Sequence, residues 1–176
     1  MIYGNKYLSE SSNNISFYEE LDDKSNNYCN KICDSLSKKE KEEFGIIGNE
    51  KHMSKERFKK VKDKILKRIV LIFNGEAAGF IEVYRENRQG TNYGEISVVV
   101  HSNHRNKGYA SILMQKIIEW YKNFSLDIKS LTYPVDKNNT SSINLAKKFG
   151  FKKMNKSEYY FSEEYYNDYP VYQYKK

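Results

Sequence analysis

The sequence lacks the two glycine-rich signatures by which phosphate-binding folds are most often found. It contains neither the Gly-Lys-Ser/Thr ending of a P-loop nor the Gly-x-Gly-x-x-Gly of a dinucleotide-binding fold. No apolar run is long enough to span a membrane, and the opening MIYGNK is too polar for a signal peptide. These absences exclude the commonest nucleotide-binding classes and lead us to expect a cytoplasmic protein.

Cysteine is also scarce. Cys29 and Cys33 lie four residues apart on an expected helix. A C-x₃-C pair with no nearby histidine lacks the usual zinc spacing, so we interpret both as packed core thiols and predict no metal site.

The chain has 176 residues, which favours a single domain over 1–176 with a proper core. The apolar fraction of 39% is low, but aromatic residues make up 15% and are spread along the chain, so the composition is not that of a disordered protein. The net charge of +7 suggests an anionic ligand or partner.

The most informative stretch is Ser97 to Phe124, SVVVHSNHRNKGYASILMQKIIEWYKNF. It indicates a buried strand, a polar turn, and an amphipathic helix that opens at Lys107-Gly108. The first N–H groups of a helix have no intrahelical partner and attract anions. Gly108 lets an anion approach the backbone, Ala110 keeps the first turn low, and Arg105 and Lys107 add positive charge. The pattern predicts a pyrophosphate site.

Two motifs together resemble the GNAT acetyltransferase superfamily. VVVHSNHRNKGYA is similar to the family's acetyl-coenzyme A loop, a hydrophobic strand followed by Arg/Gln-x-x-Gly-x-Gly/Ala. Further on, a strand and DKNNTSSINLAKKFGFKKM resemble its second element, Val-x-x-x-Asn-x-x-Ala/Ser and a helix ending in Lys-x-Gly-Phe. The resemblance covers roughly residues 66–155. The matching positions of the second element are Val135, Asn139, Ser142, Lys148, Gly150 and Phe151.

The local patterns and this resemblance predict an α/β (α+β) fold with a mixed, mostly antiparallel central sheet, a splayed parallel strand pair and flanking helices. Asn74-Gly75 predicts a tight hairpin, and 86–90 a polar loop. A helix between the strands 94–100 and 129–135 makes them parallel. The expected strands are 1–8, 68–73, 77–84, 93–100, 129–135, 151–154 and 171–174.

Helical spacing also appears in the N-terminal third. Tyr28, Ile32 and Leu36 mark one helix, within a charged segment that runs to about Phe44 and includes the run KKEKEE, which we interpret as a solvated face. Residues 45–49 form a break. Phe58, Val61 and Ile65 mark a second helix after Ser54 as N-cap. A last helix begins at Asn138 or Asn139 and ends at Gly150.

The resemblance implies that acetyl-coenzyme A binds as co-substrate in the cleft between the parallel strands. Its pantetheine arm would pair with the backbone of the first strand, its pyrophosphate would lie on the loop amides, and two polar residues would reach the arm from the opposite wall. The candidate binding residues are Val98, Val99, Val100, Arg105, Asn106, Lys107, Gly108, Tyr109, Ala110, Ser111, Asn139 and Ser142.

Acetyl transfer to an amine requires a group that removes the amine proton and a donor for the thioester oxygen. In some members of the family a glutamate in the position of Glu95 is the base; a solvent-facing carboxylate is the alternative. His101 and His104 lie nearer the pyrophosphate. Many relatives carry a tyrosine as proton donor where this chain has Ala146. Tyr133 is our candidate replacement, and a packed sheet tyrosine is the alternative.

The resulting hypothesis is an N-acetyltransferase that acts on a primary amine of a small molecule or peptide, as a monomer or homodimer. Acidic residues could line the acceptor pocket (Glu19, Glu20, Asp22, Asp23, Glu163 and Glu164), and the tyrosine-rich 159–174 segment could form a dimer surface. Ala146 motivates a rival, a non-catalytic acyl-coenzyme A-binding module.

The positive charge motivates a second rival, an acetyltransferase directed at aminoacyl-tRNA or another nucleic acid. A basic cluster could track phosphates, with a solvated helix as the alternative. Its members are Lys59, Lys60, Lys62, Lys64, Lys67 and Arg68.

Overall fold

The computed structural model describes residues 14–43, 54–124, 127–155 and 168–176. Within them, seven strands form one sheet in the order β1-β2-β3-β4-β5-β7-β6. Neighbouring strands are antiparallel except for the parallel pair β4–β5, as the sequence predicted. The strands are β1 (Ile15–Tyr18), β2 (Ile65–Phe73), β3 (Glu76–Arg88), β4 (Thr91–Val100), β5 (Leu131–Pro134), β6 (Lys152–Lys153) and β7 (Val171–Tyr174).

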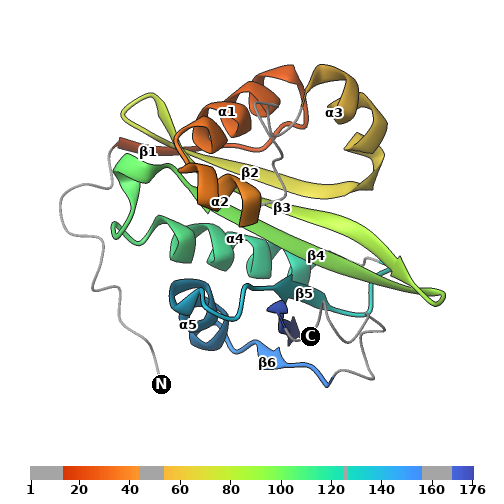
Figure 1. Ribbon diagram of the computed structural model, residues 1–176. Coiled ribbons are helices and arrows are strands. Elements are labelled where there is room, and N and C mark those ends of the chain that lie inside the picture. Colours follow the sequence, from red (N-terminus) through yellow and green to blue (C-terminus); the bar gives the residue numbers. More distant parts are fainter. Residues whose placement is uncertain (1–13, 44–53, 125–126, 156–167) are drawn as a thin grey trace.

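Helices cover both faces of the sheet. In Figure 1, α1 and α3 lie over one face, and α4 and α5 cover the other. Short 3₁₀ turns follow α3 and β4. The helical elements are α1 (Asp23–Asp34), α2 (Lys38–Glu43), α3 (Lys55–Val61), η2 (Lys62–Lys64), η3 (Ser102–His104), α4 (Tyr109–Asn123) and α5 (Thr140–Lys148).

Strand β2 has a core on each side, because successive strand residues point to opposite faces. Ile69 and Leu71 join the core beneath α4, whereas Val70 and Ile72 join the one beneath α1. The α1 core also contains both cysteines, as free buried thiols. Strand β2 is therefore buried on both faces, and the prediction of packed core thiols is confirmed.

The predicted N-terminal elements are only partly correct. The expected strand 1–8 and break 45–49 lie outside the described residues, and β1 was not predicted. The second helix was predicted to extend too far, because α3 ends at Val61 and Ile65 begins β2. Ile65 matched the helical spacing because it packs with Phe58 in the same small cluster.

The predicted polar loop 86–90 is also wrong. Strand β3 continues to Arg88, and a two-residue turn at Gln89-Gly90 leads into β4. Both turn residues have positive φ, 47° and 79°, like the predicted hairpin at Asn74-Gly75 with 52° and 80°. Such turns match the twist of the paired strands, so polar residues here belong to a long hairpin.

Arg68 does not belong to a surface cluster. Its side chain is fully buried and forms an ion pair with the equally buried Glu82 on β3. Arg68 Nη1 also donates to Ser25 Oγ on α1 at 3.1 Å, and Tyr84 donates to Glu82. This buried network joins α1 to β2 and β3, and it removes Arg68 from the basic cluster.

Candidate functional site

Strands β4 and β5 are paired only near their beginning, within the described part of the chain. Gly94 pairs with Leu131 and Glu95 with Thr132, after which the ladder ends. A cavity of about 960 Å³ lies beside the separated ends. Its walls are residues 95–100 of β4, the loop after β4, the start of α4, the end of β5, and α5. The splayed pair therefore opens onto one large cavity.

The loop between β4 and α4 carries two residues with left-handed backbone conformation, Asn106 (φ 60°) and Gly108 (φ 81°). Gly108 is the N-cap of α4, and a side-chain carbon built there would meet no atom within 4 Å. The open space therefore lies against a helix N-terminus, where N–H groups favour an anion. Arg105, Tyr109, Ala110 and Ser111 line the same cavity.

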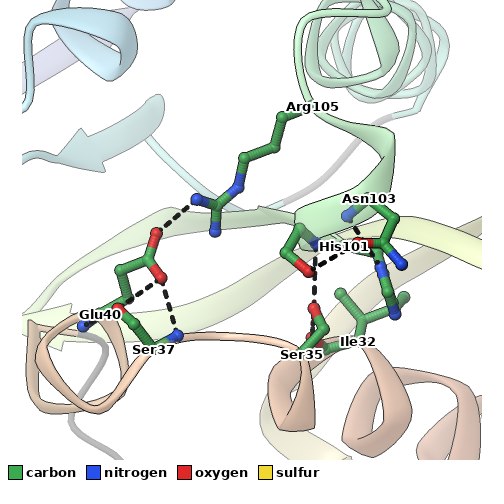
Figure 2. Close-up of polar contacts among 8 residues, drawn as sticks. Ile32, Ser35, Ser37, Glu40, His101, Asn103 and Arg105 are labelled. Atoms are coloured by element: carbon green, nitrogen blue, oxygen red, sulfur yellow. Dashed lines mark hydrogen bonds and ion pairs between the residues drawn. The ribbon is translucent and has the colours of Figure 1, made fainter.

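Two basic side chains reach this loop end of the cavity. Lys148 of α5 donates to Ser111 Oγ at 3.0 Å. Arg105 Nη1 lies 2.6 Å from Glu40 Oε1 of α2, and Figure 2 shows the two side chains extending toward each other. Lys107 does not line the cavity; its ammonium lies 5.8 Å from the centre of the Phe73 ring.

Glu95 lines the cavity at the point where β4 and β5 separate. Its carboxylate lies 3.5 Å from Arg88 Nη2 of β3, and the Glu95 side chain is 26% exposed. The carboxylate thus borders the cavity without being fully solvated.

Tyr133 lines the cavity from β5 and is 5% exposed. Burial raises the pKa of its hydroxyl to about 12, an effect partly offset by a hydrogen bond with the Ser142 side chain of α5. Its ring packs against Phe151 at 6.5 Å between centroids. Tyr133 is therefore both a packed sheet tyrosine and a cavity residue.

Helix α5 closes the other wall of the cavity. Asn139, its N-cap, accepts a hydrogen bond from the Ser142 backbone N–H at 3.0 Å, and both residues line the cavity. Ala146 is fully buried and lies among the core residues. Leu145 of the same helix, and Phe149 at its C-cap, are only partly buried.

The two histidines of the loop differ in position. His104 lines the main cavity, and its ring packs against Phe73 at 5.8 Å. Burial, together with the charge of Lys107, lowers the pKa of His104. His101 Nδ1 accepts a hydrogen bond from the Asn103 backbone N–H (Figure 2). Both histidines lie on the loop, away from Glu95.

Several cavity residues were not predicted from the sequence. Glu40 lies in KKEKEE, which we had interpreted as a solvated face, so no sequence signal separated it from its neighbours. Leu36 was assigned only to the helix core. Asp136 comes shortly after β5 and Tyr169 shortly before β7, and neither belongs to a motif. All four line the cavity.

Among the described residues, no group of three His, Cys, Asp or Glu side chains could hold a metal ion. No helix within the same ranges is long and apolar enough to cross a membrane.

The fold is the GNAT fold, and solved structures of low sequence identity share it. An N-acetyltransferase from Staphylococcus aureus Mu50 is 20% identical, with a TM-score of 0.63 over 92% of this chain and 98% of that one. Arabidopsis thaliana Naa50, solved with the bisubstrate analogue CoA-Ac-MVNAL, is 16% identical (TM-score 0.63, 93% and 99%). The GNAT domain of S. lividans PAT is 13% identical (TM-score 0.68, 92% and 89%).

The sequence itself matches the model of the acetyltransferase (GNAT) family over residues 33–151. Because this match covers more than half of the chain, the protein belongs to the GNAT acetyltransferase family. No curated protein matches the chain significantly.

Proposed function

We propose that this protein transfers an acetyl group from acetyl-coenzyme A to a primary amine by direct attack. The observation that carries the proposal is the single cavity that joins the splayed ends of β4 and β5 to the N-terminus of α4. Its shape provides a strand edge for an extended arm and helix N–H groups for a diphosphate. The Naa50 structure, which holds a coenzyme A conjugate, supports the same ligand.

In this proposal the backbone of Val98, Val99 and Val100 pairs with the pantetheine arm, and the amides from Arg105 to Ser111 bind the pyrophosphate. Asn139 and Ser142 contact the arm from α5. Lys107 contributes through its backbone, because its side chain lies over Phe73. The chemistry of this donor set suits a long, flexible ligand with a charged end.

Glu95 is the proposed general base. The neutral amine attacks the thioester carbonyl carbon, the carbon–sulfur bond breaks, and the amine proton passes to the Glu95 carboxylate directly or through water. A backbone N–H near Val99 or Val100 would stabilise the negative charge on the carbonyl oxygen. The products are an amide and the coenzyme A thiolate, which then takes a proton from water.

Tyr133, the candidate for the missing proton donor, is proposed to act on the departing sulfur as a hydrogen-bond donor. Its raised pKa keeps the hydroxyl protonated at neutral pH. A donor with a pKa near 12 stabilises a thiolate chiefly through a hydrogen bond, since full proton transfer to sulfur would be uphill. Tyr133 thereby compensates for Ala146, which is buried in the core.

The proposed acceptor is a small-molecule or peptide amine, with Glu95 and Asp136 as the carboxylates that face it. Of the acidic residues near α1, Glu19 pairs with Lys67 and Asp22 caps the helix; Glu163 and Glu164 lie outside the described residues.

The non-catalytic module remains the second candidate, favoured by Ala146. The burial of Arg68 weakens the nucleic-acid alternative.

The test is calorimetry of acetyl-coenzyme A binding to the parent, Gly108→Glu and Gly90→Glu. Gly90 is a matched control, because its φ of 79° resembles the 81° of Gly108 and its surroundings are equally open, but it lies outside the cavity. We expect binding by the parent and Gly90→Glu, and none by Gly108→Glu. A thiol-release assay with a panel of amines then separates the enzyme from the binding module. A parent that does not bind refutes both.

A further inference from the structure

Arg105 already has an anionic partner within the cavity. Its guanidinium Nη1 lies 2.6 Å from Glu40 Oε1 of α2. Both residues line the cavity, and their side chains are 42% and 33% exposed. The cation expected to meet a diphosphate is therefore paired with a carboxylate that would face the same ligand.

Glu40 is held firmly in this position. Ser37 donates to Glu40 Oε2 twice, from its hydroxyl at 2.7 Å and its backbone N–H at 2.8 Å (Figure 2). These hydrogen bonds, together with Arg105, lower the pKa of Glu40 to about 2 despite some desolvation. The carboxylate is therefore ionised at neutral pH.

A second contact joins the same two segments. The Ser102 backbone N–H donates to Ser35 Oγ at 3.0 Å, and that hydroxyl donates to the Ile32 carbonyl at 2.6 Å. The turn between α1 and α2 is thus tied to the loop after β4 at two points. The Ser102–Ser35 contact joins the two segments independently of the Arg105–Glu40 pair.

Resting on the proposed function, we infer that Glu40 sets the affinity of the cavity by competing with the pyrophosphate of acetyl-coenzyme A for Arg105. The carboxylate neutralises the cation before the ligand arrives and then lies beside an entering phosphate of the same sign. Like charges a few ångströms apart repel, with an energy reduced by solvent at this partly exposed site. Glu40 is in this sense an internal substitute for the phosphate.

The experiment compares acetyl-coenzyme A binding to the parent, Glu40→Gln and Glu119→Gln by calorimetry. Glu119 is a matched control, because it is an exposed glutamate on α4 that hydrogen-bonds Gln115 outside the cavity. Given the strength of exposed ion pairs, Glu40→Gln should bind about two- to fivefold more tightly. Glu119→Gln should match the parent.

Two further measurements assign the effect to the phosphate and to Arg105. S-acetylpantetheine lacks the diphosphate, so Glu40→Gln should bind it no better than the parent does. In an Arg105→Gln background, Glu40→Gln should increase the affinity for acetyl-coenzyme A less than it does in the parent. The melting temperature of each variant confirms that it is folded.

Unchanged or weaker binding by Glu40→Gln overturns the inference, and weaker binding would mean that Glu40 orients Arg105 for the ligand. An equal gain for S-acetylpantetheine also overturns it. A parent that does not bind acetyl-coenzyme A refutes the proposed function, and the inference with it. In the first two cases the parent binds and the proposed function stands.

Discussion

At the scale of single residues, the proposed proton transfer depends on Glu95. Replacing it with glutamine keeps the size of the side chain but removes the group that accepts a proton. We expect the turnover number of Glu95→Gln to fall by about 10²- to 10⁴-fold, while its affinity for acetyl-coenzyme A stays near that of the parent. Steady-state kinetics and calorimetry measure the two quantities.

Glu86→Gln is the control for this substitution, because Glu86 is a carboxylate of the neighbouring strand β3 that does not line the cavity. It should retain the parent's turnover. If Glu95→Gln also retains full turnover across the pH range, another group or water removes the amine proton.

For Tyr133, the prediction concerns how the turnover number depends on pH. Burial raises the pKa of its hydroxyl from 10.0 to about 12, so the proton stays in place throughout neutral and moderately alkaline solution. Tyr133→Phe should lower the turnover number by a similar factor at every pH from 7 to 10, with little change in KM for acetyl-coenzyme A. A ratio that falls toward one between pH 9 and 10 would show that the hydroxyl is already ionising there.

Single residues also show which site features could be predicted from the sequence and which could not. Gly108 was predictable, because Arg-x-x-Gly after a strand and before a helix requires an open backbone position. Glu40 was not, since its partner Arg105 lies 65 positions further along the chain. Arg68 was misassigned for the same reason, because its partner Glu82 comes from the next strand.

At the scale of elements, the geometry of the cavity depends on how closely β4 and β5 approach before they separate. Gly94 stands at that point, and a side-chain carbon there would lie 2.8 Å from Ile128 Cδ1 and 3.0 Å from Leu131 Cδ2. Gly94→Val should destabilise the protein by about 1–3 kcal/mol through overpacking. It should also weaken acetyl-coenzyme A binding by pushing β5 outward.

Urea unfolding measures the first effect, and calorimetry the second. Thr91→Val, on the same strand, replaces a hydroxyl by a methyl group away from this contact and should leave both quantities near the parent values. A Gly94→Val protein as stable as the parent would show that β5 is not packed this closely against β4.

The boundaries of helices and strands were predicted correctly where a local sequence signal sets them. Asn74-Gly75 gave a hairpin because both positions have positive φ. Asn139 begins the last helix by accepting the Ser142 N–H, and Gly150, with φ 79°, follows its C-cap. Gln89-Gly90 forms a turn of the same kind, but the surrounding polar residues concealed it. Their strand conformation comes from backbone pairing in a long hairpin, which side-chain polarity does not report.

At the scale of the whole molecule, the two cysteines report on the integrity of the fold. Both are buried beneath α1, and burial raises the pKa of Cys33 to about 12 and that of Cys29 well above its usual range. Because the thiolate is the reactive form, neither should react with an aromatic disulfide reagent at pH 8 until the protein unfolds.

Thiol modification in increasing urea should therefore follow the global unfolding curve, with two equivalents released. Phe124→Cys is the control, since Phe124 is 54% exposed and a thiol there should react at once. Rapid modification of the parent in native buffer would mean that α1 opens locally.

The sequence by itself determined the two motifs, the strand–helix–strand crossover and the turns, because these depend on contacts between residues close together in the chain. It also predicted an anionic ligand, through a glycine that opens a helix N-terminus. Only the tertiary structure decided which charges line the cavity. The pairs Arg105–Glu40 and Arg68–Glu82, and the bond between Tyr133 and Ser142, join different elements. Such partners come into contact only when the sheet and helices pack, so no local sequence pattern predicts the contact.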